Sequence, residues 1–364
     1  MKSYIHTYPT RIFHFLLVIY VLAIFLISEE KNLLPLHVAI GYGILILIIF
    51  RIYFGFFGPL YSRFKDWPLS IKESFEFILN FFHPKEYISH NPLASFAILA
   101  IVINLFLVVI SGMLVYGIQE GIGVVSFLND SLYKDMNLYK DIHQLFSNIL
   151  LGLIFIHISG VLVDRVLHKD KKTLNSIFNG YKNIKAKNSK LSNTQKIISS
   201  IFLTLAIITP LYLFSTNNIL MSSKYKKIDY EQELEVFVEE CASCHIIYPP
   251  HLLPKNAWNK IMDNLEEHFG DDASIDKDSN KIIREYLLKN SAQNSKKQVS
   301  INVLNTYIEE IAISENKYWK DVHKNLEKSL FKSKKVKTKS NCKACHTNFE
   351  NGIIENRDID IPKI

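Results

Sequence analysis

Five long apolar stretches constrain this chain more than any other feature of its sequence. They lie at residues 12–27, 36–50, 93–117, 142–163 and 197–214, and none contains a lysine, arginine, aspartate or glutamate. A helix of about 20 apolar residues spans a bilayer, and these stretches are nearly that long or longer. The first could be taken for a signal peptide, but no small-x-small cleavage site follows FLISEE at 25–30. We therefore predict five membrane-spanning helices, with the first one retained.

Basic residues predict how these helices cross the membrane. The loop at 165–196 holds nine lysines and arginines and one acid, Asp170. The connection at 51–91 holds five basic residues, whereas 28–32 and 118–140 are poorer in them. Basic loops stay in the cytoplasm, so we predict a cytoplasmic N-terminus and an exported segment after the fifth span. The net charge of +7 then mostly reflects topology, and we expect no nucleic-acid binding.

All four cysteines fall in that exported segment, as two Cys-x-x-Cys pairs each followed by histidine. The motifs are Cys241, Cys244, His245 and Cys342, Cys345, His346. Two disulfides or a thioredoxin-like pair would leave the histidines unexplained. Zinc ribbons place their pairs closer together than these, between which 97 residues lie. Cys-x-x-Cys-His is the attachment motif of c-type haem, in which the thiols bond the porphyrin and the imidazole binds iron. Two copies predict two haem c groups, with His245 and His346 as proximal ligands.

Two further histidines are candidates for the opposite side of these irons. The segment 255–270 is typical of a helix that begins at an Asn256 cap and ends at Gly270. In such a helix His268 shares the apolar face of Trp258, Ile261 and Leu265. His323 follows the aromatic pair of YWKDVHKNL and is the second candidate. We interpret His251 as a surface or packing residue.

Residues 228–364 resemble the dihaem cytochrome c family. The resemblance rests on the first motif running into YPP at 248–250, LP at 253–254, a tryptophan segment ending in HFG at 268–270, the second motif, and DIDIP at 358–362. It implies low-spin haems with two histidines each, and it gives His268 and His323 the distal role. Which of the two serves which haem stays open.

Four histidines lie within the predicted spans, where ionisable residues are costly and therefore point to function. His143 and His157 of the fourth span are 14 residues apart, which is about 21 Å of helix and returns nearly to the same face. The predicted topology places His37 at the level of His143 and His14 at the level of His157. We therefore predict two haem groups in the membrane, one held by each pair. The alternative is that these histidines only pack between helices.

Residues 5–185 resemble the bacterial cytochrome b-561 family and the cytochrome b subunits of nickel-iron hydrogenases. The matching motifs are RIFHF, LHVAIGY, RIYFGFFGPLYSRF, SHNPL and HQLFSNILLGLIFIHISGVLVD. The resemblance implies that the four span histidines bind two b haems. Arg51 and Arg63 lie in the basic turn of the family, either beside haem propionates or as positive-inside anchors. We assign no haem to His90, and we expect His6, His83 and His168 at the solvent or headgroup level.

These expectations combine into one architecture, an all-α membrane protein of the bacterial inner membrane. We expect a four-helix cytochrome b bundle at 1–185, a linker with a fifth transmembrane helix at 186–227, and a mostly helical periplasmic dihaem cytochrome c domain at 228–364. Such a protein would carry electrons between the quinone pool and a periplasmic electron-transfer protein, with quinol:cytochrome oxidoreductase activity as one form of this function. The alternatives are a cytochrome subunit of a larger hydrogenase or reductase with a catalytic partner subunit and, less favoured, a haem peroxidase or gas-binding protein.

Charge in the tail is unevenly distributed. Residues 228–280 contain thirteen acids and three lysines, whereas 324–345 contains eight lysines and one acid, Glu327. The plain interpretation is two solvated faces. The sharper hypothesis is that the lysines near the second motif attract an acidic redox partner.

Overall fold

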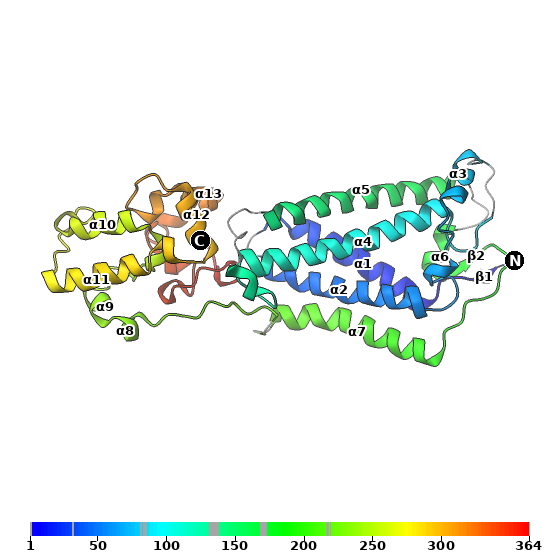
Figure 1. Cartoon of the computed structure of the whole chain (residues 1–364), viewed down its shortest axis with the longest axis horizontal. Coiled ribbons are helices and arrows are strands. Elements are labelled where there is room, and N and C mark those ends of the chain that lie inside the picture. Colours follow the sequence, from blue (N-terminus) through cyan, green and yellow to red (C-terminus); the bar gives the residue numbers. More distant parts are fainter. Residues whose placement is uncertain are drawn as a thin grey trace. The chain divides into compact units, whose positions relative to one another are not determined.

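The computed structural model is mostly helical and divides into two compact units (Figure 1). It describes residues 2–30, 33–80, 82, 86–130, 138–167, 173–215, 218 and 220–363. The first unit, here called the membrane unit, contains residues 1–115 and 137–218. The second, the tail unit, contains residues 116–136 and 219–364.

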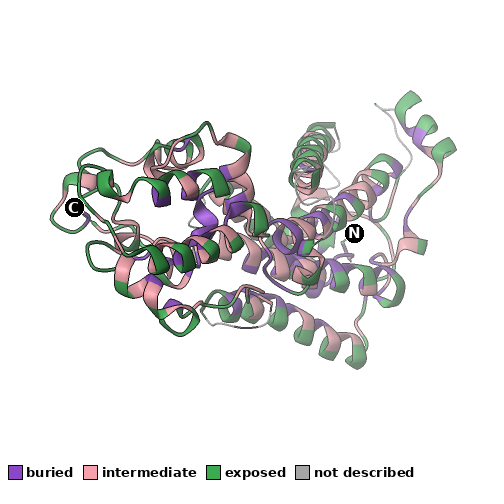
Figure 2. Cartoon of the chain, turned by 60° about the vertical axis from the view of Figure 1, so that its left-hand side comes forward, coloured by how far each residue is buried: buried purple, intermediate pink, exposed green. Residues whose placement is uncertain are grey.

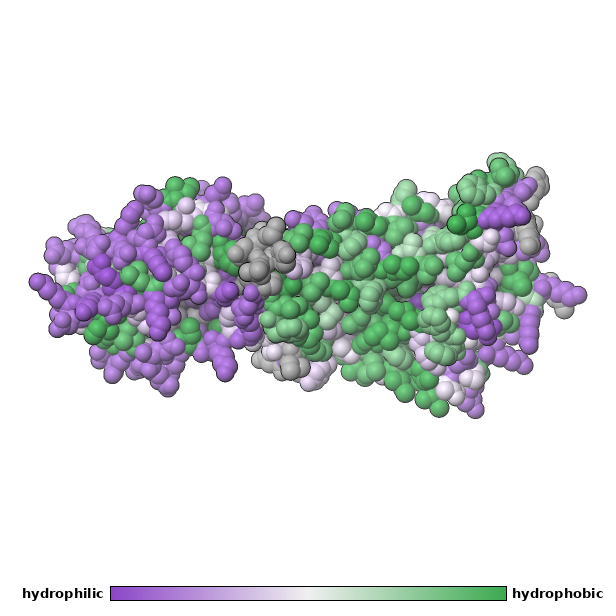
Figure 3. Space-filling model, in the orientation of Figure 1, coloured by the Kyte–Doolittle hydropathy of each residue, from purple (hydrophilic) through white to green (hydrophobic). Residues whose placement is uncertain are grey.

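Five helices of the chain are long and apolar enough to cross a membrane, which confirms the predicted spans. They are Tyr8–Ile27 (α1), Leu34–Phe57 (α2), Pro92–Gln119 (α4 at Pro92–Leu114, continued by a π-helical turn), Leu138–Leu167 (α5) and Asn193–Ser215 (α7). Their outer surface is apolar (Figure 3). Proline near the start of α1, α2 and α4 favours these helix starts, because its fixed φ suits the first turn and its missing N–H is not needed there.

Helix α2 lies at the centre of the membrane unit. It packs against α1, α4 and α7, while α4 packs against α5. Buried residues concentrate along α2, whereas α1 and α5 present mainly intermediate and exposed residues (Figure 2). The shorter elements of this unit are Ser3–Tyr4 (β1), Ile71–Leu79 (α3), Thr173–Asn179 (α6) and Tyr181–Lys182 (β2). Antiparallel pairing of β1 with β2 joins the start of α1 to the chain that follows α5.

The contact between α2 and α7 depends on a proline inside a helix. Pro210 has no N–H to donate to the carbonyl of Ala206, so this carbonyl needs another partner in an apolar environment. The hydroxyl of Tyr20 supplies it, with an O–O distance of 2.8 Å. Gly43 lies against both side chains, and an added Cβ would come within 2.7 Å of Pro210 Cγ and 2.8 Å of Tyr20 Cε2. The rigid ring and the hydrogen-bonded phenol leave no room for a larger residue.

The tail unit is built from short helices around one core. The helices are Tyr230–Glu233 (α8), Glu235–Cys241 (α9), Lys255–Asp263 (α10), Lys277–Lys289 (α11), Gln298–Thr306 (α12) and Lys317–His323 (α13). Phe237 of α9, Trp258 and Ile261 of α10 and Ile283 of α11 meet in the buried cluster. The indole N–H of Trp258 donates to the carbonyl of Pro250 at 2.8 Å, so the polar atom of this core residue is satisfied.

The segment 116–130 groups with the tail unit, although the sequence-based limits place it in the membrane domain. Backbone hydrogen bonds explain the difference: Gly123 N donates to Ser222 O and Lys224 N donates to Gly121 O, each at 2.9 Å. The hydroxyl of Tyr225 also donates to Asn129 Oδ1 at 2.7 Å. Gly121 has φ +70°, and a Cβ there would lie 2.8 Å from the Tyr225 ring. The connection between the third and fourth spans therefore belongs structurally to the tail unit.

Two histidines outside the predicted haem sites, His6 and His251, are both buried. His6 is buried, not exposed to solvent or headgroups as expected, because the β1–β2 pairing encloses the residues before α1. His251 is buried as well, so of its two expected positions it takes the packing one. His83 and His168 lie outside the described residues.

Gly43 offers a first test of this packing. We expect Gly43→Ala to lower the free energy of unfolding by about 1–3 kcal/mol, because overpacking forces rigid neighbours apart. Gly152 of α5, which is exposed and has no atom within 4 Å of an added Cβ, provides the matched control. Gly152→Ala should leave stability unchanged or raise it by up to about 1 kcal/mol. Thermal unfolding of the two variants in detergent makes the comparison, and equal effects would contradict the packing described.

His251 offers a second test, through pH. Burial, with a smaller effect of Lys297, holds the pKa of His251 well below its usual 6.5. The folded chain therefore keeps the ring neutral, while the unfolded chain binds a proton below pH 6.5. Stability should be full above that pH and should fall as pH decreases, by up to about 1.4 kcal/mol per pH unit. Urea unfolding of the intact protein, followed by tryptophan fluorescence, should show a smaller loss between pH 7 and 5 for His251→Asn. Equal losses would contradict the assignment.

Candidate metal centres

Three of the predicted histidine pairs have facing rings at nearly the same separation, and a further pair outside the prediction, His6 with His90, has ring centres 5.7 Å apart. The ring centres of His37 and His143 are 6.2 Å apart, and those of His245 and His268 and of His323 and His346 are each 6.1 Å apart. An imidazole nitrogen binds a transition metal at about 2 Å and lies about 1 Å from its own ring centre, so two rings on opposite sides of one metal have centres about 6 Å apart. Each pair therefore leaves the space that one metal with two axial imidazoles needs.

The remaining ligands of such a metal would have to come from elsewhere. Among the residues that the structure describes, no three histidine, cysteine or acidic side chains gather to hold a metal ion. Two opposed imidazoles without further protein ligands suit an iron whose other four positions are taken by a porphyrin.

The first pair in the membrane unit is His37 near the start of α2 and His143 near the start of α5. His143 Nδ1 lies 3.0 Å from the carbonyl oxygen of Val108 and 3.1 Å from Ser111 Oγ on α4. A hydrogen bond from Nδ1 to a carbonyl fixes the tautomer and leaves Nε2 free to bind a metal. Gly112 provides the space for this ring, since an added Cβ would lie 3.0 Å from His143 Cε1.

The second pair in the membrane unit is His14 on α1 and His157 on α5. These residues are close enough to influence each other electrostatically. Arg11 Nη1 donates to Phe178 O at 2.5 Å, which helps to bring the start of α1 to the chain that follows α5. The buried Nδ1 of His14 has no hydrogen-bond partner among the described residues. The structure thus places four span histidines as two pairs toward opposite ends of the helix bundle.

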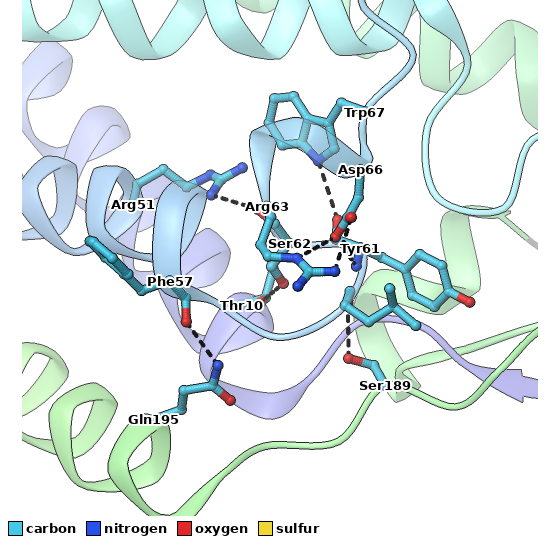
Figure 4. A network of polar contacts seen from close by, with 11 residues as sticks. Thr10, Arg51, Phe57, Tyr61, Ser62, Arg63, Asp66, Trp67, Ser189 and Gln195 are labelled. Carbon is cyan, nitrogen blue, oxygen red and sulfur yellow. Dashed lines mark hydrogen bonds and ion pairs between the residues drawn. The ribbon is translucent and has the colours of Figure 1, made fainter.

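Arg51, in the last third of α2, is a buried cation of the membrane unit. Its guanidinium lies 4.7 Å from the ring centre of Trp67 and 5.1 Å from that of Phe64, and Nη1 donates to Ser62 O at 3.2 Å (Figure 4). Within the described ranges no carboxylate pairs with it. A buried charge normally requires an opposite partner, so Arg51 fits the binding of an anionic group such as a propionate.

Arg63, the other arginine predicted near a propionate, already has a partner. Its Nε and Nη2 bind the two carboxylate oxygens of Asp66 at 2.8 and 3.0 Å (Figure 4). This bidentate pair holds the turn after α2, where Asp66 also accepts the backbone N–H of Tyr61. Of the two arginines, only Arg51 keeps its charge uncompensated by an acid among the described residues.

The first pair in the tail unit joins His245 to His268. The Cys241–His245 motif follows directly from α9, and His245 Nδ1 lies 2.7 Å from the carbonyl oxygen of Ile246, which leaves Nε2 as the binding atom. Burial, and then proximity to His245, lowers the pKa of His268, so this ring stays in the neutral form that binds metals.

His268 does not reach this position on a helix, so the sequence-based prediction of one helix from Asn256 to Gly270 is wrong. Helix α10 begins at Lys255, after a Pro254 cap, and ends at Asp263. Side chains of α11 terminate it, because Asn280 Nδ2 donates to Met262 O at 3.0 Å and Arg284 pairs with Asp263 at 2.6 Å.

A tight turn presents His268 instead. Its backbone N–H donates to Asp271 O at 2.8 Å, and Asp271 N donates back at 3.2 Å. Phe269 and Gly270 between them have φ of +55° and +98°, as in hairpin turns that need positive φ at both central positions. Gly270 therefore shapes the turn rather than ending a helix.

The second pair in the tail unit joins His323, at the end of α13, to His346. His323 Nδ1 lies 2.8 Å from the carbonyl oxygen of Trp319, one turn earlier, and the two rings stack at 4.4 Å. Burial, and then His323, lowers the pKa of His346 to about 4, so its ring is neutral at pH 7. The segment ending the chain holds this motif, since Asp360 N donates to Cys345 O at 2.8 Å. The pairing of His268 with His245 and of His323 with His346 was left open by the sequence.

The four cysteines form no disulfide. Burial raises the pKa of Cys241 to about 11 and that of Cys342 to about 12. At neutral pH both are therefore protonated thiols. The described residues bring no three cysteine, histidine or acidic side chains together as a zinc site needs, which favours thioether bonds to a porphyrin.

Tyr248 connects the two sites of the tail unit. Its ring centre lies 5.2 Å from that of His245 and 5.7 Å from that of Phe349, three residues after His346. Its hydroxyl donates to Ser340 O at 2.6 Å, two residues before Cys342. Both histidine pairs therefore lie within one continuously packed unit.

Sequence reasoning missed the residues that orient the histidines. Val108 and Ser111 lie in a span that carries no histidine, so only the packing of α4 on α5 brings them to His143. Trp319 lies one helical turn before His323, and the spacing i, i+4 is the signal that could have identified it.

The histidine pairs predict a spectroscopic outcome. We expect His268→Ala and His323→Ala each to convert one low-spin haem to the high-spin form, because each removes one of two axial imidazoles. Electron paramagnetic resonance of the oxidised full-length protein makes the measurement. His251→Asn changes a buried histidine of the same unit outside the pairs, and it should leave every haem low-spin. A fully low-spin spectrum after His268→Ala would contradict the pairing.

Comparisons with known proteins find matches for both parts of the chain. The family model of prokaryotic cytochrome b561 matches residues 5–180, and that of dihaem cytochrome c matches residues 237–353. A solved diheme cytochrome c from Rhodobacter sphaeroides is 32% identical, over 35% of this chain and 100% of that chain, with a TM-score of 0.31. A diheme cytochrome type c from Shewanella baltica OS155 is 33% identical, over 35% of this chain and 91% of that chain, with a TM-score of 0.29.

No match was found among curated proteins. The two family models together include all four span histidines and both Cys-x-x-Cys-His motifs. The chain therefore belongs to the dihaem cytochrome c family through its tail, and residues 5–180 of its membrane unit match the family model of prokaryotic cytochrome b561.

Proposed function

We propose that this chain passes electrons between the quinone pool and a periplasmic redox partner, using two haem b and two haem c groups. The family membership already makes it a membrane haem protein of electron transfer. The histidine pairs carry the finer proposal: three at 6.1–6.2 Å and a fourth, His14 with His157, close enough for electrostatic coupling. Eight of the thirteen histidines are used in this way.

The protein residues have defined roles in this proposal. Haem, when bound, supplies the one-electron chemistry. Two imidazoles on each iron leave no open position for a peroxide or a gas, which favours electron transfer over the peroxidase alternative. The cysteines of the two motifs would hold haem covalently in the tail unit, and the spans would exclude water around the histidine pairs of the membrane unit. Arg51 neutralises a propionate, since its buried guanidinium has no acid partner among the described residues.

The proposed orientation follows from charge. The connections at 51–91 and 165–196 carry most of the basic residues near the spans, which supports a cytoplasmic position for them and for the N-terminus. Five crossings then lead to a periplasmic tail, in the compartment where bacteria attach c-type haem. Quinone enters the proposal through the membrane location and the cytochrome b561 family of the first unit.

Reduction by a quinol tests this function. We expect a decylubiquinol or menadiol solution to reduce both b-type and c-type haems of the purified full-length protein. His143→Ala should block reduction of the c haems by quinol while dithionite still reduces them, because the electrons would have to pass this pair. Ser111→Ala, which removes one contact of His143 Nδ1 but keeps Val108 O, should retain quinol reduction.

Two results would contradict the proposal. If neither quinol reduces any haem of the wild-type protein, the chain does not oxidise quinol. If the c haems of His143→Ala are reduced by quinol as fast as in wild type, electrons do not pass the His37–His143 pair. A co-purifying catalytic subunit that supplies the electrons would replace quinol as the donor.

A further inference from the structure

The loop between His323 and Cys342 carries a dense group of exposed lysines. Its backbone is folded by local hydrogen bonds, including Leu330 N to Glu327 O, Ser333 N to Leu330 O and Lys337 N to Ser333 O. Leu330 and Val336 anchor it, with 3% and 2% of their surface exposed. The lysine surface, as we call it, comprises Lys332, Lys334, Lys335, Lys337 and Lys339, all exposed within eight residues. A compact loop necessarily holds these charges close together.

Acids of the described ranges do not pair directly with the lysine surface, although Glu315, which pairs with Lys320, is near enough to Lys339 to interact with its charge. In the part of the chain that the structure describes, none of its five lysines forms an ion pair. Lys335 Nζ donates to the carbonyl of Lys363, and Lys339 Nζ lies 5.9 Å from the ring centre of Trp319. The tail unit therefore presents a group of like charges whose mutual repulsion only a negative partner would relieve.

Lys337 adds a conformational observation. Its φ is +71°, in the left-handed region that glycine occupies readily and a residue with a Cβ does not. The loop thus has a charged side chain at a position where its backbone favours glycine. Such a local conflict points to a role for the side chain outside the fold.

The lysine surface lies beside the His323–His346 pair of the tail unit. The loop runs from one histidine of the His323–His346 pair to the motif of the other, and Lys339 lies over the Trp319 ring that stacks on His323. Asp358 and Asp360 also act on His346 and Cys345 of this site, whereas the His245–His268 pair has no comparable group of lysines beside it. Its flanking charges are the acids Glu239, Glu240, Glu266, Glu267, Asp271 and Asp272. A negatively charged protein would be attracted to the first site and repelled from the second.

We propose that the lysine surface docks an acidic electron-transfer protein, which exchanges electrons at the His323–His346 site. This inference rests on the proposed electron-transfer function and names the chemistry of the partner. In each encounter one electron moves: one protein loses it and the other gains it, with no bond made or broken. Complementary charge speeds such encounters and makes their rate fall with ionic strength.

Charge reversal tests the docking surface. The full-length protein, reduced with dithionite, is mixed in a stopped-flow instrument with an acidic plastocyanin as the probe, at several ionic strengths. We expect Lys334→Glu, Lys335→Glu and Lys337→Glu together to lower the low-salt rate by about tenfold or more and to remove its decline with salt. A basic cytochrome c as the second probe should react faster with this variant than with wild type.

Two further variants control for charge and for folding. Lys277→Glu, Lys281→Glu and Lys289→Glu on α11 change the net charge equally, at exposed positions outside the lysine surface, and should leave the rate with plastocyanin within about twofold of wild type. Lys337→Gly removes one charge where the backbone favours glycine, so it should keep the haem spectrum and thermal stability while lowering the rate by a smaller factor.

The possible outcomes distinguish a failure of the docking surface from a failure of the proposed electron-transfer function. An unchanged salt dependence in the lysine-surface variant, or an equal loss in the α11 variant, would overturn the docking surface. So would loss of binding to phosphatidylglycerol vesicles with no change toward plastocyanin, because the surface would then contact lipid. A protein whose haems are not reoxidised even by uncharged benzoquinone would instead fail as an electron-transfer protein.

Discussion

The separation of about 6 Å between facing imidazoles is the constraint on which the structure of this protein depends. Each of the three pairs with this separation joins residues from different elements: α2 with α5, the end of α9 with a turn after α10, and α13 with the last motif. A shift of one helix against its neighbour would change this separation directly. The hydrogen bonds of histidine Nδ1 atoms to backbone carbonyls therefore fix both the tautomer and the ring position.

The membrane unit maintains this constraint with small residues and satisfied carbonyls. Gly43 allows α2 to approach Pro210, and Tyr20 satisfies the carbonyl that Pro210 leaves without a donor. Gly112 makes space for the ring of His143. In an apolar environment an unpaired carbonyl is costly, so these contacts stabilise the bundle and position the histidines at the same time.

Much of this arrangement could be predicted from the sequence, because apolar length, Cys-x-x-Cys-His and the spacing of His143 and His157 are local signals. The remainder depended on tertiary contacts. Side chains from α11 end α10, so His268 lies in a turn instead of on a helix. Asp66 forms an ion pair with Arg63. The pairing of β1 with β2 buries His6. Backbone bonds to 222–224 assign the segment 116–130 to the tail unit. None of these partners is near in sequence to the residue it affects, apart from Asp66.

The central claim is that every iron in this chain is held between two histidines, two irons in each unit. A pyridine haemochrome assay of the purified full-length protein, combined with electron paramagnetic resonance of the oxidised form, measures both the number and the ligation of the haems. The account predicts two b-type and two c-type haems per chain, all low-spin. A different ratio, or a high-spin signal from the intact wild-type protein, would contradict it.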